Sequence, residues 1–208
     1  MESGQWLSLF IVCLLGAVSP GPSLAVVMNA TMAGGRGAGV ACALAHGLGV
    51  ALYGALTVAG LALLITGSPT LFTGLQLLGA AYLIHLGIRA LRNRPRAGDT
   101  PTPVAPARGA AASGFLVAFL NPKLAVFMLA LFSQFLSPAT TVAVKGIMVA
   151  TVGITDASWY CLVVALVSHP ALLARLRANS TAIDRVFGAI LLALGCTVML
   201  RAVLPLVA

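Results

Sequence analysis

The chain has 208 residues, of which 60% are hydrophobic and 8% are charged, with a mean hydropathy of +1.06 and a formal net charge of +8. Ordinary soluble domains carry roughly 25% charged residues, so this composition excludes a soluble enzyme and predicts an integral membrane protein. A spanning helix needs about 20 apolar residues, so the chain has room for six spans and short loops but for no sizeable domain outside the bilayer.

The apolar runs predict an all-α integral membrane protein with six transmembrane helices. They are long and unbroken, whereas a closed β-barrel would need short segments of alternating polarity. The first run follows Glu2 with no Lys or Arg ahead of it, unlike a secretory signal peptide, so we count it as a span. The predicted spans are 6–32, 39–66, 70–91, 111–136, 142–168 and 183–204.

The first predicted span contains a proline break. Its stretch SPGPSLAVVM places Pro20, Gly21, Pro22 and Ser23 near the middle of the apolar run. A proline inside a helix removes a hydrogen bond and costs about 3 kcal/mol, yet it suits the first position of a new helix. We therefore expect the span to stop and restart, with Gly21 as an acceptable N-cap.

The second predicted span carries His46, in AHGLGVALYG. Histidine can change charge near neutral pH, so His46 is a candidate for proton coupling. The alternative is a hydrogen-bonded packing residue, which is the more common role of a single histidine among Gly and Ala. The Gly and Ala of the second and third spans, GLGVALYG and GAAYLIHLG, allow helices to approach closely and would permit a homodimer.

Residues 92–110 form the longest predicted loop and divide the chain into repeats at 1–91 and 111–208. The loop is rich in Pro, Ala and Arg and has too little apolar material to fold, so it is interpreted as a flexible basic cytoplasmic linker. Contact with anionic lipid headgroups is one use for its arginines, at about 1 kcal/mol each, and the general bias of basic residues toward cytoplasmic loops is the other.

The fourth predicted span contains a second break, in FLVAFLNPKLAVFM. Here Asn121 is a good N-cap, Pro122 suits the first helical position, and Lys123 follows. The motif PKLAVFM matches PSLAVVM of the first span at five of seven positions, 100 residues apart. Three membrane crossings separate the copies, which makes them antiparallel and predicts two inverted three-helix repeats, as in many secondary transporters.

Two charges lie near the middle of predicted spans, Lys123 in the fourth and Asp156 in the fifth. Each costs about 2.5 to 3.5 kcal/mol at the bilayer centre, so charges at this depth usually mark a functional site. In one interpretation Lys123 and the two new helix N-termini bind the carboxylate of a zwitterion, while Asp156 binds its ammonium or the coupled proton. In the other, Lys123 and Asp156 form a structural ion pair.

Basic residues gather in alternate loops, after the first, third and fifth spans. This asymmetry places those loops in the cytoplasm and predicts that both termini are periplasmic. It also accounts for the net charge without nucleic-acid binding, which would need a folded basic surface. The residues are Arg36, Arg89, Arg92, Arg94, Arg96, Arg108, Arg175, Arg177 and Arg185.

Three stretches resemble the LysE/RhtB amino-acid exporter family: SPGPSLAVVM, GAAYLIHLGIRALR and FLNPKLAVFMLALFSQF, with Asp156 following. The resemblance covers nearly the whole chain in order. It implies a multi-pass protein of the bacterial inner membrane that exports amino acids or close derivatives by using the proton motive force. The matching site positions are Pro20, Gly21, Pro22, Asn121, Pro122, Lys123 and Asp156.

The sequence thus predicts a secondary transporter that exports neutral, zwitterionic amino acids by proton antiport, with no cofactor and no enzymatic activity. A heavy-metal or other small-solute exporter is the alternative, for which Cys42 and His46 would be one pair of soft ligands. An intramembrane thiol oxidoreductase is less favoured, because the four cysteines are scattered singly without a CxxC motif. ATP-driven transport is excluded for this chain alone, which has no P-loop motif.

Overall fold

The computed structural model describes residues 3–19, 21–92, 109–166 and 178–207, and within these ranges it contains helices and no strands. This confirms the predicted all-helical class. The helices are α1 (Ser3–Val18), α2 (Pro22–Gly67), α3 (Pro69–Arg92), α4 (Ala110–Phe119), α5 (Pro122–Phe135), α6 (Val142–Leu166) and α8 (Ser180–Val207). Most of the predicted linker 92–110 and the end of the fifth predicted span lie outside the described residues.

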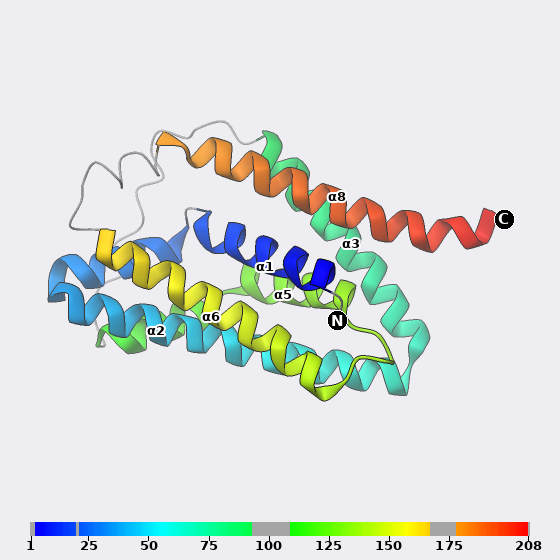
Figure 1. Cartoon of the computed structure of the whole chain (residues 1–208), viewed down its shortest axis with the longest axis horizontal. Coiled ribbons are helices and arrows are strands. Elements are labelled where there is room, and N and C mark those ends of the chain that lie inside the picture. The colour runs from blue at the N-terminus through cyan, green and yellow to red at the C-terminus, as the bar shows by residue number, and fades with distance from the viewer. Residues whose placement is uncertain (1–2, 20, 93–108, 167–177, 208) are drawn as a thin grey trace.

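Four of the described helices are long and apolar enough to cross a membrane, and a fifth span results when α4 and α5 are counted together across their bend. The remaining apolar helix, α1, has only 16 residues. The helices lie roughly along one direction, and the start of α1 and the end of α8 are directed toward the same end of the bundle (Figure 1).

The predicted loop between the first two spans, residues 33–38, coincides with a kink at Gly35 where two helical segments meet, and the residues on either side of Gly35 are helical. With 46 residues, a straight α2 would be about 69 Å long, more than twice the roughly 30 Å hydrocarbon core. Gly35 resolves this, because its φ of 76° is in the left-handed region and separates α2 into two helical segments at a kink. The bend forms the turn at the left of Figure 1.

Close contacts between small residues hold α2 against α6. A Cβ added to Gly47 would lie 2.6 Å from the Cβ of Ala157, and one added to Gly153 would lie 2.7 Å from the Cβ of Ala51. Both helices thus present the pattern Gly-x-x-x-Ala to each other. Since apolar burial gives little advantage over lipid, such backbone contact is a main source of association between spanning helices.

A second close crossing joins α3 to α8. Gly87 and Gly188 face each other so closely that a Cβ on either would lie 2.6 or 2.7 Å from the carbonyl oxygen of the other. Fully buried apolar side chains from six helices complete the core between these two crossings. They include Leu9, Leu61, Leu83, Phe132, Met148 and Leu191.

Candidate functional site

A cavity of about 370 Å³ lies inside the bundle, where both helix breaks meet α3, α6 and α8. Its volume falls in the usual range for small-molecule sites, at the lower end. It is lined by six of the residues predicted from the sequence to form the site: Gly21, Pro22, Ser23, Asn121, Lys123 and Asp156, together with His46. Pro122 is not among the lining residues, and Pro20 lies outside the described residues.

The first break separates α1 from α2, as the proline pattern predicted. α1 ends at Val18, and α2 restarts with Gly21 as N-cap and Pro22 in its first turn. No side chain caps this helix end, and the amide N–H groups of Ser23 and Leu24 have no acceptor among the described residues. The cavity is therefore bordered by a helix N-terminus with a partial positive charge.

The second break separates α4 from α5, and the two helices meet at an angle of 55°. Asn121 is the N-cap, as predicted: its side-chain oxygen accepts hydrogen bonds from the backbone N–H of Lys123 at 3.0 Å and of Leu124 at 3.3 Å. This cap satisfies two of the donors that an anion would otherwise use. The two helix ends therefore differ, and the one at Gly21 is the more available to a ligand.

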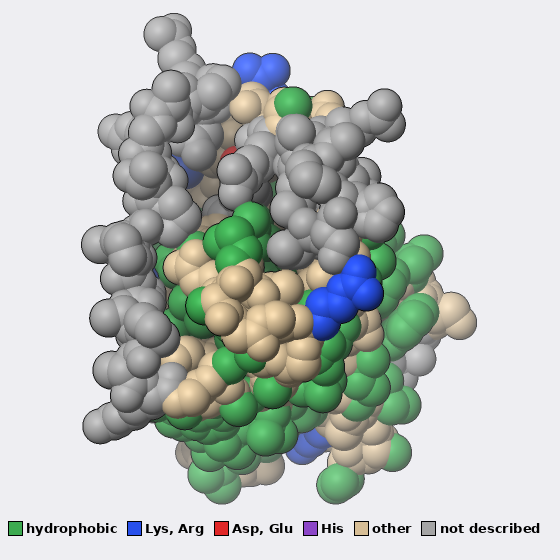
Figure 2. Space-filling model, turned by 90° about the vertical axis from the view of Figure 1, so that its left-hand side faces the viewer, with side chains coloured by type: hydrophobic (Ala, Val, Ile, Leu, Met, Phe, Trp, Pro, Cys, Tyr) green, Lys and Arg blue, Asp and Glu red, His purple; other side chains and the backbone are tan. Residues whose placement is uncertain are grey.

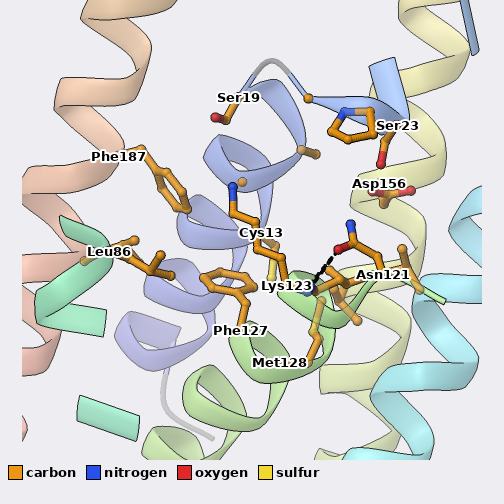
Figure 3. Close-up of a pocket in the computed structure, with 18 of the residues that line it drawn as sticks. Cys13, Ser19, Ser23, Leu86, Asn121, Lys123, Phe127, Met128, Asp156 and Phe187 are labelled. Carbon is orange, nitrogen blue, oxygen red and sulfur yellow. Dashed lines mark hydrogen bonds between the residues drawn. The ribbon is translucent and has the colours of Figure 1, made fainter. Parts of the chain in front are cut away.

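Lys123 and Asp156 border the same cavity but do not pair with each other. Within the described ranges, Asp156 makes an ion pair with His46, and the alternative interpretation of a structural pair between Lys123 and Asp156 does not hold. Lys123 is exposed to the cavity, whereas Asp156 is buried. Figure 3 shows Lys123, Asn121, Ser23 and Asp156 around one space.

His46 and Asp156 form a buried pair that joins α2 to α6. The His46 Nδ1 lies 2.6 Å from the Asp156 Oδ2, and the two side chains are 3% and 11% exposed. A hydrogen on Nδ1 donates to the carboxylate, which leaves Nε2 as a lone-pair acceptor in the neutral ring. Nε2 is buried and has no hydrogen-bond partner among the described residues.

Tyr160 is part of this site although the sequence analysis did not select it. Its ring packs edge-to-face on His46 with 4.9 Å between ring centroids, and its hydroxyl donates to the carbonyl of Ala17 at 3.4 Å. Tyr160 follows Asp156 by four residues, so both lie on one face of α6, and that spacing was the available signal. The ring connects the buried pair to the end of α1.

Three further polar residues line the cavity and were also missed: Ser19, Arg89 and Asp184. The Ser19 hydroxyl donates to the Asp184 Oδ1 at 2.8 Å and so links the first break to α8. The sequence analysis interpreted Arg89 only as a basic residue near a cytoplasmic loop. It assigned no role to Asp184, which lies at the start of the sixth predicted span. Figure 2 shows basic side chains on the end of the bundle at the left of Figure 1.

The described residues include no group of three or more His, Cys, Asp or Glu side chains that could hold a metal ion. The four cysteines are free: Cys13, Cys42, Cys161 and Cys196. The cavity instead has groups that can bind a small molecule carrying both a positive and a negative charge. These groups are the Lys123 ammonium, a helix N-terminus and carboxylates, and the apolar part of the wall includes Phe127 and Phe187.

An apolar helical bundle with a cavity that holds opposite charges between broken helices has the architecture of a membrane transporter. The chain belongs to the LysE type translocator family, whose model matches residues 14–202. This confirms the resemblance found in the sequence.

The individual relatives are membrane proteins. The chain is 30% identical to the uncharacterized membrane protein YahN of Escherichia coli over 190 residues, which cover 89% of this chain and 83% of the relative. It is 29% identical to an uncharacterized membrane protein of Haemophilus influenzae, covering 93% and 95% of the two chains. It is 32% identical to a leucine efflux protein of Klebsiella pneumoniae, covering 61% and 63%. No solved structure matches the chain significantly.

Proposed function

We propose that this protein is a proton-coupled exporter of neutral, zwitterionic amino acids in a bacterial inner membrane. The observation that carries the proposal is the cavity in which Lys123 and the uncapped N-terminus at Gly21 lie opposite the buried Asp156. Lys123 and the helix end bind the substrate carboxylate, and Asp156 binds the ammonium or the coupled proton. The relative named as a leucine efflux protein supports an amino acid as the cargo.

The antiport is assigned to His46 and Asp156. A proton on this pair removes the negative charge that would hold the substrate ammonium, so proton and substrate compete for one carboxylate. Such competition converts an inward proton gradient into outward transport of substrate. The pair lies between α2 and α6, which are in close contact through small residues.

The proposed architecture has six spans in two inverted three-helix repeats, 1–91 and 111–208. Two breaks at matching positions support it, as does the matching Gly-x-x-x-Ala pattern of α2 and α6. After its bend α2 runs left to right in Figure 1, whereas α6 runs right to left. The distribution of arginines supports an orientation with both termini in the periplasm and basic loops in the cytoplasm.

Efflux from proteoliposomes tests this function. Vesicles are preloaded with labelled leucine, threonine, homoserine or alanine, an inward proton gradient is imposed, and wild type is compared with Lys123→Met. We expect gradient-driven efflux of at least one of these amino acids and a reduction of at least about 10-fold in Lys123→Met, because a charge-assisted hydrogen bond is lost. Lys145→Met is the matched control, since Lys145 does not line the cavity. Efflux of none of the four by folded protein would contradict the proposal.

A further inference from the structure

Arg89 and Asp184 border the central cavity on α3 and α8, and the Ser19 hydroxyl at the first break contacts Asp184. Their two helices are fixed to each other by the contact of Gly87 with Gly188. Arg89 is two residues beyond Gly87, and Asp184 is one turn ahead of Gly188, so both residues are held near the same crossing. The charge pair is therefore carried by two helices that are in close backbone contact.

The two charges do not neutralise each other. Asp184 accepts a hydrogen bond from the neutral Ser19 hydroxyl at 2.8 Å. Arg89 forms no ion pair or hydrogen bond within the part of the chain that the structure describes, and its side chain is exposed to the cavity. A guanidinium and a carboxylate thus line one cavity with space between them, which repeats the arrangement of Lys123 and Asp156.

A zwitterion presents the two groups that such a pair recognises. Arginine binds a carboxylate through two parallel N–H donors, which gives geometric specificity as well as energy. Asp184 can accept from an ammonium, and a charged donor there forms a stronger hydrogen bond than the neutral Ser19 hydroxyl it would replace. The spacing of opposite charges selects molecules that carry both, and a simple amine or acid satisfies only half of the site.

The positions of Arg89 and Asp184 along their helices indicate which face of the membrane the pair is near. Arg89 lies within the last turn of α3, which ends at Arg92, and Asp184 lies near the start of α8 at Ser180. In the proposed orientation both helix ends face the cytoplasm. Substrate that enters from the cytoplasm therefore meets Arg89 and Asp184 before it reaches Lys123 and Asp156.

We infer that Arg89 and Asp184 form an entrance site that captures zwitterionic amino acids from the cytoplasm and passes them to the inner site at Lys123 and Asp156. The inference rests on the proposed function and adds a second site to it. It assigns to Ser19 the role of a competitor, which occupies Asp184 when no substrate is present.

Transport kinetics measured separately from each face of the membrane test the entrance site. Inverted membrane vesicles expose the cytoplasmic face, and concentration-dependent uptake is measured for each of the four amino acids that the wild type transports. We expect Arg89→Gln and Asp184→Asn to raise the half-saturating concentration from this face about 10-fold, with the maximal rate within about twofold of wild type. Arg89→Lys, which keeps the charge but loses the paired donors, should fall between wild type and Arg89→Gln.

The controls separate this role from a structural one. Arg92→Gln and Arg185→Gln change neighbouring arginines that do not line the cavity and should behave as wild type. Ser19→Ala should leave the half-saturating concentration unchanged or lower it, because it removes a competitor for Asp184. A Ser19→Ala defect equal to that of Asp184→Asn would show that the bond only holds α1 to α8 and would overturn the inference.

Other outcomes are also decisive. Unchanged half-saturation in both Arg89→Gln and Asp184→Asn overturns the entrance site while leaving the exporter function intact. An equal rise when substrate is supplied from the opposite face assigns both residues to the inner site instead. Failure of the wild type to transport any of the four amino acids overturns the proposed function, and the entrance site with it.

Discussion

The imidazole of His46 lies 2.6 Å from the carboxylate of Asp156, in a part of the bundle where both side chains are almost fully buried. This contact joins the second predicted span to the fifth. A buried charge without a partner has a high free-energy cost in a membrane. Each of these two residues lowers that cost for the other.

The pair makes a prediction about coupling. Asp156→Asn should abolish the stimulation of efflux by a proton gradient, because the amide cannot take up the proton. If Asp156 acts in coupling, substrate exchange without a gradient should persist at a reduced rate. The measurement is gradient-driven efflux against counterflow in the same proteoliposomes.

His46→Gln tests the partner. The glutamine can still donate to Asp156 but cannot take up a proton as an imidazole can, so we expect efflux to depend less on pH in His46→Gln than in wild type. His85→Gln is the matched control, since His85 is exposed on α3 and does not line the cavity. An unchanged pH profile in His46→Gln would remove His46 from the coupling path.

The Asn121 cap makes a prediction about stability. Its side chain holds two backbone donors at the start of α5, so Asn121→Ala should lower the free energy of unfolding by about 1 kcal/mol. Asn121→Asp should retain the cap, because aspartate is an equally good N-cap residue. Thermal unfolding in detergent measures both variants, and equal midpoints for Asn121→Ala and wild type would contradict the energetic role of the cap.

The sequence predicted the breaks and their caps because these depend on local chemistry. Pro22 and Pro122 lack an N–H and suit a first helical turn, and Asn121 is a strong N-cap in any context. The all-helical class and the residues around the two breaks followed from the same local rules. The turn after the first predicted span was expected from the glycine content of ATMAGGRGAG, but only Gly35 leaves the helical conformation there, so the turn is a kink and shorter than the predicted loop.

The partners of the charges could not be predicted in the same way. The depth of Lys123 and Asp156 in the sequence left open whether they pair with each other or bind substrate, because which side chains meet depends on how α2, α5 and α6 rotate against one another. The contact of Gly47 with Ala157 sets that rotation and brings His46 to Asp156. Asp184 and Arg89 were missed for the same reason, since their shared cavity depends on the crossing of α3 and α8.

The α2–α6 crossing makes a prediction about packing. Gly153→Ala places a methyl group 2.7 Å from the Cβ of Ala51, so the helices must separate and the unfolding midpoint should fall. Since His46 and Asp156 span the same interface, gradient-driven efflux should fall with it. Gly146→Ala is the control on the same helix, because a Cβ at Gly146 meets nothing within 4 Å. Equal stability of the two variants would contradict backbone contact at this crossing.

The bend at Gly35 makes the last prediction. Its φ of 76° is unfavourable for a residue with a Cβ, by roughly 1 to 2 kcal/mol, so Gly35→Ala should destabilise the protein by that amount or straighten α2. A straighter α2 would displace Ser23 and the N-terminus at Gly21 from the cavity, and transport should fall more than stability does. Gly37→Ala is the matched control two residues away, with no positive φ and open space around the new methyl group. Thermal unfolding and efflux are measured on both variants; if Gly35→Ala matches Gly37→Ala in both, α2 does not depend on a left-handed residue at its bend.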